Sequence, residues 1–324
     1  TVISKPSEHT SIIAFEAINL FLDQGLPEDA IHLFLGDGDI AQAIILNQSI
    51  DLVAFTGSLK TAKMIHQSLS SKAGKIVPMI AETGGLNTMI IDSSALLERA
   101  CDDIIRSAFN SAGQRCSALR LLLIQEEIYP QLMSMLKGAM NDLTIGAPND
   151  LNVDVGPIIN TDSLNKLESY LHKMKSEGHT IFQIAKDCMP DDGCFLPPTL
   201  IELELSLMPD EEQFGPILHV ASFTEETLID ALKEIDSKGF ALTFGIHTRI
   251  DARALEVAKH TSSGNIYINR DIVGAVVETQ PFGGKNLSGS GFKAGGPNYL
   301  LQFMDERVVT VNTVAIGGNI DLIN

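Results

Sequence analysis

Short apolar runs alternate with segments of helical period along most of this sequence, and this alternation most constrains the fold. Residues 11–23 place apolar side chains at helical spacing, and Gly25 and Pro27 follow where such a helix would end. The next apolar run, residues 31–35, is closed by GDG at 36–38, which is typical of a strand and a turn. Strands separated by helices pair in parallel, because tight hairpins join only antiparallel neighbours. We therefore predict an α/β fold.

The same alternation continues into the second half of the chain. Further strands are expected near residues 51–58, 75–82, 89–91, 120–125, 219–223, 241–246 and 264–269, and further helices near residues 40–46, 60–71, 96–110 and 128–140. Two adjacent glycines, Gly84 and Gly85, allow a hinge, so we place a domain boundary there. Residues 306–312 (ERVVTVN) predict an isolated edge strand, which needs a partner, such as a strand of another subunit.

The composition argues against several classes of function. There are 41 acidic and 23 basic residues, which give a formal net charge of −18. So acidic a surface repels phosphate backbones and anionic lipid heads, and we expect no nucleic acid contact. No apolar run reaches the roughly 18 residues that span a bilayer, and the first residues lack the pattern of a signal peptide. We therefore expect no transmembrane segment and a cytoplasmic location.

The cysteines point to neither a disulfide framework nor a metal centre. Four of them, Cys101, Cys116, Cys188 and Cys194, are too few for a framework in so long a chain. A zinc site built on His179, Cys188 and Cys194 would match no common ligand spacing, so we predict no metal site. Apart from Cys116, the cysteines lie in no distinctive context, and we assign them structural roles.

Residues 111–117 (SAGQRCS) form the most informative segment. A cysteine attacks as its thiolate, and Arg115 would favour the thiolate of Cys116 if its charge lay nearby. The small residues before Cys116 let the backbone approach a reacting carbon, and the N–H of Cys116 can help to stabilise an oxyanion. A lone cysteine is usually a small core residue. The small polar neighbours on both sides of this one favour a nucleophile instead.

Two further segments end apolar strands. Glu82 ends one of them, before Gly84 and Gly85, where a carboxylate could activate water for hydrolysis of a thioester. A helix N-cap or a surface salt bridge is the alternative. Residues 55–58 (FTGS) end another strand where a helix begins, and free N–H groups there suit a phosphate, although any such turn looks similar. The GDG at 36–38 lacks the full glycine fingerprint of a dinucleotide-binding turn.

Two loops complete the set of motifs. Residues 211–216 (EEQFGP) place an acid before an aromatic ring, which could bind a ribose hydroxyl and pack a flat ring, or form only an acidic surface turn. Residues 280–284 (QPFGG) lie between VGAV at 273–276 and SGSG at 288–291. Dense glycine with one aromatic predicts a shaped loop over a pocket, or an irregular connector.

Together, in this order and spacing, the motifs resemble the aldehyde dehydrogenase family over nearly the whole chain. The matching pieces are KPSE at 5–8, FTGS at 55–58, ETGG at 82–85, GQRC at 113–116, EQFGP at 212–216 and PFGG at 281–284. The resemblance implies an α/β fold with part of a Rossmann-type cofactor domain at 1–84, a complete catalytic domain at 85–302, and an oligomerisation strand and tail at 303–324. It also implies NAD as the cofactor and a homo-oligomer.

The resemblance assigns roles to individual residues. Cys116 resembles the catalytic nucleophile, and Glu82 resembles the general base for the deacylating water. Lys5 and Glu8 correspond to the positions that hold the adenosine ribose of the cofactor in the family. Gly57 and Ser58 correspond to those that meet the pyrophosphate. Glu212, with Phe214 beside it, corresponds to the position that holds the nicotinamide ribose.

A closer resemblance is to the dehydrogenase modules of the bacterial proline utilization A enzymes. It is carried by residues 81–85 (AETGG), 107–120 (SAFNSAGQRCSALR), 293–299 (KAGGPNY) and 310–319 (TVNTVAIGGN). The implied substrate is L-glutamate γ-semialdehyde, in equilibrium with Δ1-pyrroline-5-carboxylate, and the implied product is L-glutamate. The resemblance implies that Ser117 and the backbone N–H groups of Gly274 and Ala275 bind the substrate's α-carboxylate. The ring of Phe282 would pack against its aliphatic part.

The chain departs from the family pattern at its start. Family members run well before the KPSE segment, so we expect the first part of the cofactor domain, part of the oligomerisation flap and an oxyanion-hole Asn to lie upstream. A proline dehydrogenase module with its FAD is expected there as well. A fragment lacking these parts could be inactive. Two alternatives therefore stay open: a folded or oligomerising module without activity, and a Cys–Glu esterase that needs no NAD.

Overall fold

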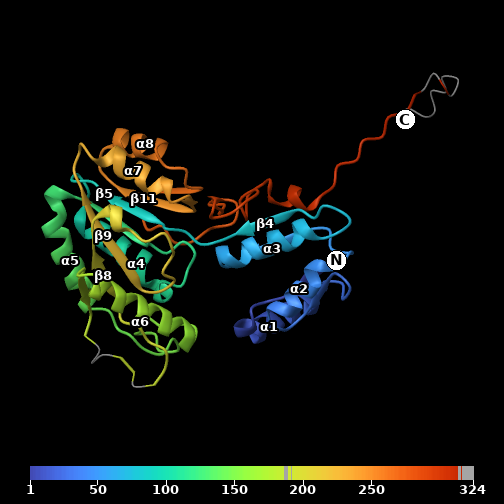
Figure 1. Cartoon of the computed structure of the whole chain (residues 1–324), viewed down its shortest axis with the longest axis horizontal. Coiled ribbons are helices and arrows are strands. Elements are labelled where there is room, and N and C mark those ends of the chain that lie inside the picture. Colours follow the sequence, from blue (N-terminus) through green and yellow to red (C-terminus); the bar gives the residue numbers. More distant parts are fainter. Residues whose placement is uncertain (186–188, 191, 313–314, 316–324) are drawn as a thin grey trace.

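The structure, a computed structural model, describes residues 1–185, 189–190, 192–312 and 315 (Figure 1). An N-terminal part contains two small parallel sheets, and a larger part that follows is built on one seven-stranded sheet. Both parts contain strands and helices in alternation, which confirms the predicted α/β fold.

The N-terminal part begins with a strand that leads into a helix. Its elements are β1 (Val2–Ser4), a 3-10 turn (Glu8–Thr10), α1 (Ser11–Asp23), β2 (Ile31–Leu33), α2 (Gly38–Leu46), β3 (Val53–Thr56), α3 (Leu59–Ser71) and β4 (Met79–Glu82). β1 pairs with β2, and β3 pairs with β4, both in parallel. The helix predicted over residues 11–23 is confirmed at both ends, whereas the strand expected from residue 75 begins only at Met79.

The seven-stranded sheet has the order β12-β11-β5-β6-β9-β8-β7. Every neighbouring pair is parallel except β7 and β8. The strands are β5 (Thr88–Ile91), β6 (Leu121–Gln125), β7 (Thr180–Gln183), β8 (Thr199–Glu202), β9 (Ile217–Phe223), β11 (Thr243–His247) and β12 (Asn265–Ile268). The short strands β10 (Phe240–Ala241) and β13 (Lys285–Asn286) form a separate antiparallel pair.

Helices cover both faces of this sheet, as Figure 1 shows. One face carries α4 (Leu97–Phe109), α5 (Tyr129–Asn141) and α6 (Thr161–Ser176), and the other carries α7 (Leu228–Ser237) and α8 (Asp251–Lys259). Alternate residues of β5 face the two layers: Met89 and Ile91 pack with α4 and α5, whereas Ile90 packs with α7 and α8. A strand covered on both faces is apolar at successive positions, which explains the uninterrupted apolar run in the sequence.

Residues 306–312, predicted as an edge strand that needs a partner, have no strand partner among the described residues of the single chain, so the edge strand stays a prediction. Residues 304–312 carry no helix or strand, and Figure 1 shows the segment running away from the rest of the molecule. A strand exists through hydrogen bonds to a neighbour, and none of the described strands pairs with this run. Most of the predicted tail at 313–324, and Cys188, lie outside the described residues.

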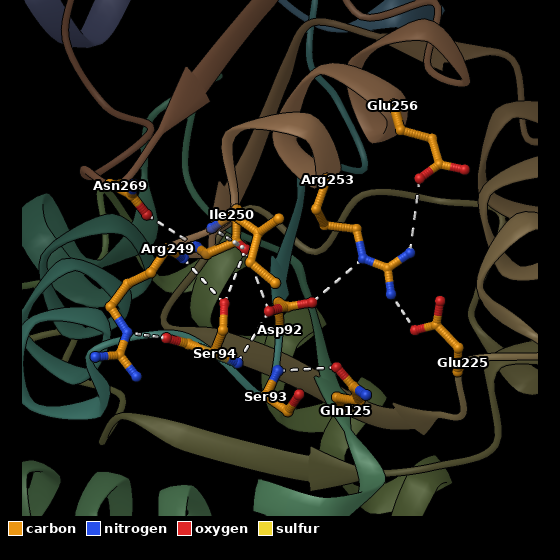
Figure 2. A network of polar contacts seen from close by, with 11 residues as sticks. Asp92, Ser93, Ser94, Gln125, Glu225, Arg249, Ile250, Arg253, Glu256 and Asn269 are labelled. Carbon is orange, nitrogen blue, oxygen red and sulfur yellow. Dashed lines mark hydrogen bonds and ion pairs between the residues drawn. The ribbon is translucent and has the colours of Figure 1, made fainter.

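A network of polar contacts lies at the carboxyl-terminal edge of the large sheet (Figure 2). Asp92, directly after β5, accepts hydrogen bonds from Thr248 Oγ1 at 3.2 Å and from Arg253 Nε at 3.3 Å. Arg253, on α8, also pairs with Glu225 and Glu256. Ligands of open α/β sheets usually bind at this edge, where the strand order reverses. At this edge Arg253 pairs with the three carboxylates of Asp92, Glu225 and Glu256, and the predicted nucleophile lies at the opposite edge, before β6.

Candidate active site

The segment between α4 and β6 has an unusual backbone conformation. Ser111, Ala112 and Gly113 have φ angles of 55°, 53° and 64°, a region that residues other than glycine seldom adopt. This turn brings Cys116 to the amino-terminal end of β6. The buried Asn87 holds the next stretch of backbone, because its Nδ2 donates to the carbonyl oxygen of Cys116 at 2.6 Å. Asn87 belongs to no motif and was not predicted from the sequence.

The thiol of Cys116 is half-buried, and its surroundings set its reactivity. Burial raises the pKa of this thiol above its ordinary value, and the Glu212 carboxylate raises it further, with a smaller contribution from Glu82. The peptide N–H groups of Ser117 and of Cys116 itself oppose that rise. These N–H groups favour negative charge on the sulfur, and they are also suitable donors to an oxyanion on a carbon bonded to it.

Arg115 does not influence this thiol in the way considered from the sequence. Its exposed side chain turns back, and Nε donates to Ser111 Oγ at 2.9 Å. The groups that shift the pKa of Cys116 do not include it. Neighbouring residues direct their side chains to different sides of the chain, so adjacency in sequence did not place the charge at the sulfur.

Glu212 forms a buried ion pair with Arg120. Their side chains are 15% and 1% exposed, and Nη2 and Nε of the arginine donate to Glu212 Oε1 at 2.9 and 3.1 Å. The guanidinium also donates to the carbonyl oxygens of Gly215 and Arg115, at 3.1 and 3.2 Å. The ring of Phe214 lies 5.4 Å from Arg120 Cζ. Arg120 therefore joins the nucleophile segment to the loop of Glu212, a role that sequence analysis missed.

Glu82 ends β4 with a half-buried carboxyl group. Burial raises the pKa of Glu82 to about 7, against the opposing effects of the Gly284 N–H and of Lys293. Gly284 N donates to Oε2 at 3.4 Å, and Gly57 N donates to the carbonyl oxygen of Glu82 at 3.0 Å. Glu82 thus lies between the turn after β3 and the loop at 281–284. A carboxyl group that titrates near neutrality can take a proton from water.

Glycines let the motif segments approach more closely than side chains would permit. A Cβ atom on Gly113 would lie 2.2 Å from the carbonyl oxygen of Gly215, and one on Gly283 would lie 2.9 Å from Glu82 Oε1. The nucleophile segment therefore packs backbone to backbone against the 212–216 loop. The 281–284 loop packs directly against the carboxylate of Glu82.

The other predicted cofactor residues lie in the N-terminal part. Ser58 caps α3 and, like Gly57, is exposed. The free N–H groups at the start of a helix of 13 residues can bind a phosphate. Lys5 and Glu8 follow β1, in the other small sheet; Lys5 is half-buried and Glu8 is exposed. In the part of the chain that is described, no hydrogen bond or ion pair joins these four residues to Cys116.

The predicted substrate residues differ in burial and in their hydrogen bonds. Ser117 is buried and adjoins the nucleophile. Phe282 is half-buried and exchanges backbone hydrogen bonds of 2.9 and 2.8 Å with Ala294. Gly274 and Ala275 are exposed, and Gly274 has a φ of 94°. Within the described ranges, no hydrogen bond links them to Ser117.

Two further findings concern metals and membranes. Over the residues that the structure describes, no group of three or more His, Cys, Asp and Glu side chains could hold a metal ion. No helix in those same ranges combines the length and the apolar character needed to cross a bilayer.

Comparison with known proteins identifies the family. The model of the aldehyde dehydrogenase family matches residues 1–309. The chain belongs to the aldehyde dehydrogenase family. The resemblance inferred from the ordered motifs is therefore confirmed.

Relatives within the aldehyde dehydrogenase family include the bifunctional protein PutA of Klebsiella aerogenes, which is 41% identical over 316 residues, 95% of this chain and 24% of PutA. A crystal structure of a mutant Bradyrhizobium japonicum proline utilization A matches with a TM-score of 0.93 and 45% identity, over 97% of this chain and 32% of that one. A 1-pyrroline-5-carboxylate dehydrogenase from Thermus, with bound NAD, matches with a TM-score of 0.87 and 28% identity, over 94% of this chain and 59% of that one. The chain thus spans only part of each relative's length.

Proposed function

We propose that this chain is the catalytic part of an NAD-dependent aldehyde dehydrogenase that oxidises L-glutamate γ-semialdehyde to L-glutamate. The semialdehyde is in equilibrium with Δ1-pyrroline-5-carboxylate, which appears in the name of the Thermus relative. The observation that carries the proposal is the packing of the motif segments around two half-buried side chains: the turn that carries Cys116 packs against the 212–216 loop, and the Glu82 carboxyl group packs against the 281–284 loop.

The chain's own residues account for two chemical stages. In the first, the Cys116 thiolate attacks the aldehyde carbon and forms a hemithioacetal, whose oxyanion accepts hydrogen bonds from the Ser117 and Cys116 N–H groups. Loss of a hydride from that carbon leaves a thioester on Cys116. In the second stage, Glu82 takes a proton from a water molecule that attacks the thioester, and the products are the carboxylate and the free thiol.

The residues fit a dinucleotide, although NAD itself is not part of the structure. The exposed start of α3 at Gly57 and Ser58 offers N–H donors to a pyrophosphate. Glu8 and Lys5 supply polar groups for one ribose, and Glu212 lies beside the nucleophile for the other. When bound, NAD supplies the acceptor for the hydride.

The substrate's α-carboxylate needs hydrogen-bond donors that replace its water. Ser117 and the N–H groups of Gly274 and Ala275 are the proposed donors, and Phe282 would pack against the aliphatic carbons. A φ of 94° at Gly274 suits an exposed turn that presents N–H groups to a ligand. We further propose that the protein forms homo-oligomers in the cytoplasm, works with a proline dehydrogenase module, and pairs residues 306–312 with a neighbouring subunit.

The test is NADH formation by the purified chain with the semialdehyde and NAD, followed by absorbance. Cys116→Ala should abolish the signal, whereas Cys194→Ala, a second half-buried cysteine, should retain it. Turnover by Cys116→Ala would overturn the proposal. So would a chain whose Cys116 is alkylated by iodoacetamide but which yields no NADH. A parallel assay of a nitrophenyl ester without NAD distinguishes the esterase alternative.

A further inference from the structure

The loop at 281–284 is fixed by hydrogen bonds on nearly every backbone group. Asn265, the first residue of β12, donates from Nδ2 to the Pro281 carbonyl at 2.8 Å and accepts from Gly283 N at 3.2 Å. The Gly283 carbonyl accepts a hydrogen bond from Lys293 Nζ. The next N–H, that of Gly284, donates to Glu82 Oε2. One peptide unit therefore has the lysine on its carbonyl and the carboxylate on its N–H.

Lys293 is held in place within this arrangement. It is half-buried, and besides the Gly283 carbonyl its Nζ donates to Asn265 Oδ1 at 3.3 Å. A Cβ atom on Gly264 would lie 2.7 Å from Nζ, so the backbone there leaves room for the ammonium group. Over the described parts of the chain, no ion pair within 4.0 Å includes Lys293, and its charge is not cancelled by a direct partner.

We propose that Lys293 is a positioning residue for Glu82: its ammonium group orients the Gly283–Gly284 peptide toward the carboxylate, and its charge favours the ionised form that accepts a proton from water. This inference rests on the proposed role of Glu82 as the general base. Electrostatics support the geometry, since Lys293 holds the pKa of Glu82 down against burial, and Glu82 in turn holds the pKa of Lys293 up.

The other charged and titratable groups around this pair have distinguishable effects. The carboxylates of Glu212 and Glu82 both raise the pKa of the Cys116 thiol, and Arg120 forms an ion pair with Glu212. Lys285, in β13, lowers the pKa of Lys293 but is not among the groups that shift the pKa of Glu82. Lys285 therefore provides a matched control: a lysine from the same loop region without a direct effect on the carboxylate.

The decisive experiment is a pH titration of the Glu82 carboxyl ¹³C signal by NMR, in chain labelled at the glutamate side chains. Glu82→Gln identifies the signal by its disappearance. In the unaltered chain the expected midpoint is about 7. Lys293→Met should raise it, by up to about one pH unit, because the charge of Lys293 lowers the pKa of the Glu82 carboxyl group.

Further variants separate charge from hydrogen bonding. Lys293→Arg keeps both and should leave the midpoint near its original value, whereas Lys293→Gln keeps a donor without the charge and should behave like Lys293→Met. Lys285→Met should leave the midpoint in place. The inference is overturned if Lys293→Met and Lys293→Gln both titrate like the unaltered chain, or if Lys285→Met shifts the midpoint as far as they do.

This readout does not depend on turnover. A chain in which the Lys293 variants shift the Glu82 midpoint but which forms no NADH would contradict only the proposed function. A chain that forms NADH while Lys293→Met leaves the midpoint unchanged would contradict only the role of Lys293.

Discussion

The carboxylate of Glu212 occupies the space that a side chain at Gly84 would need. A Cβ atom on Gly84 would lie 1.7 Å from Glu212 Oε2, and the same carboxylate is bound by Arg120 through Oε1. The glycine of one motif thus leaves room for the acid of another, more than a hundred residues later in the chain.

Gly84→Ala should therefore destabilise the fold, because Glu212 would have to leave its position beside Arg120. The expected loss is about 1–3 kcal/mol, as for overpacked sites, measured by urea unfolding. Gly138→Ala is the matched control: this glycine lies inside α5 with nothing within 4 Å of its added Cβ, so the change should stabilise by about 0.5–1 kcal/mol. A Gly84→Ala chain as stable as the original would contradict the packing described here.

Removing the charge of Arg120 should cost much more than removing that of Arg115. Arg120→Met leaves the buried carboxylate of Glu212 without its partner, and breaking such a pair costs about 3–5 kcal/mol. Arg115 is exposed, and among the described residues its side chain hydrogen-bonds only to Ser111, so Arg115→Ala should change stability by less than about 0.5 kcal/mol. Equal losses in the two variants, measured by urea unfolding, would show that Arg120 does not join the two loops.

The features that could be predicted from the sequence are those whose signals are local. The helix over 11–23 and the strand at 120–125 carry their own periodicity or apolar run, and the structure contains both. Helix α6 was missed, because only Leu167 and Met174 of its 16 residues are buried and its apolar stripe is thin. A local pattern also could not decide whether residues 306–312 would find a strand partner.

The contacts of the candidate site depend on residues far apart in sequence. The motifs pointed to Glu212 and Cys116. Arg120 lies 92 residues from Glu212 in the sequence, so its ion pair with Glu212 could be recognised only in the folded structure. The same reason explains the conditional role given to Arg115: it was the nearest cation in sequence, whereas the fold brought another cation to the site.

The Cys116 thiol should become more reactive when the charge of Glu212 is removed. Burial and the Glu212 carboxylate both raise the pKa of Cys116, so Glu212→Gln should lower it and increase the thiolate fraction at pH 8. We expect several-fold faster alkylation by iodoacetamide, followed by mass spectrometry, since each pKa unit changes the thiolate fraction by up to about tenfold. Glu211→Gln, at the exposed neighbouring acid, should leave the rate unchanged. A slower reaction in Glu212→Gln would contradict the described electrostatics.

Stability should fall in mildly acidic solution, because of the buried His219. Burial lowers the pKa of His219 from 6.5 to about 4, and its ring is bonded to Tyr170 Oη at 2.7 Å. Between these two pH values the unfolded chain binds the proton and the folded chain does not. The lowered pKa of His219 therefore has no effect on stability above about pH 6.5, and it destabilises the fold progressively as the pH falls towards 4, by about 3 kcal/mol in all.

The measurement is the free energy of unfolding in urea at pH 7 and at pH 4.5. His219→Gln removes the titrating ring, so its loss of stability between these pH values should be smaller than that of the unaltered chain. Replacing the exposed His260 by Gln provides the control and should leave the difference unchanged. An identical pH dependence in the His219 and His260 variants would contradict this account.

The central claim, that Glu82 activates water against an acyl group on Cys116, is tested most directly by intact-mass spectrometry of Glu82→Gln after mixing with the semialdehyde and NAD. The acyl group should accumulate on Cys116 with about one NADH formed per chain, while the unaltered chain turns over without a lasting adduct. Continued turnover by Glu82→Gln at the original rate, or an adduct absent from Cys116 although NADH forms, would contradict the claim.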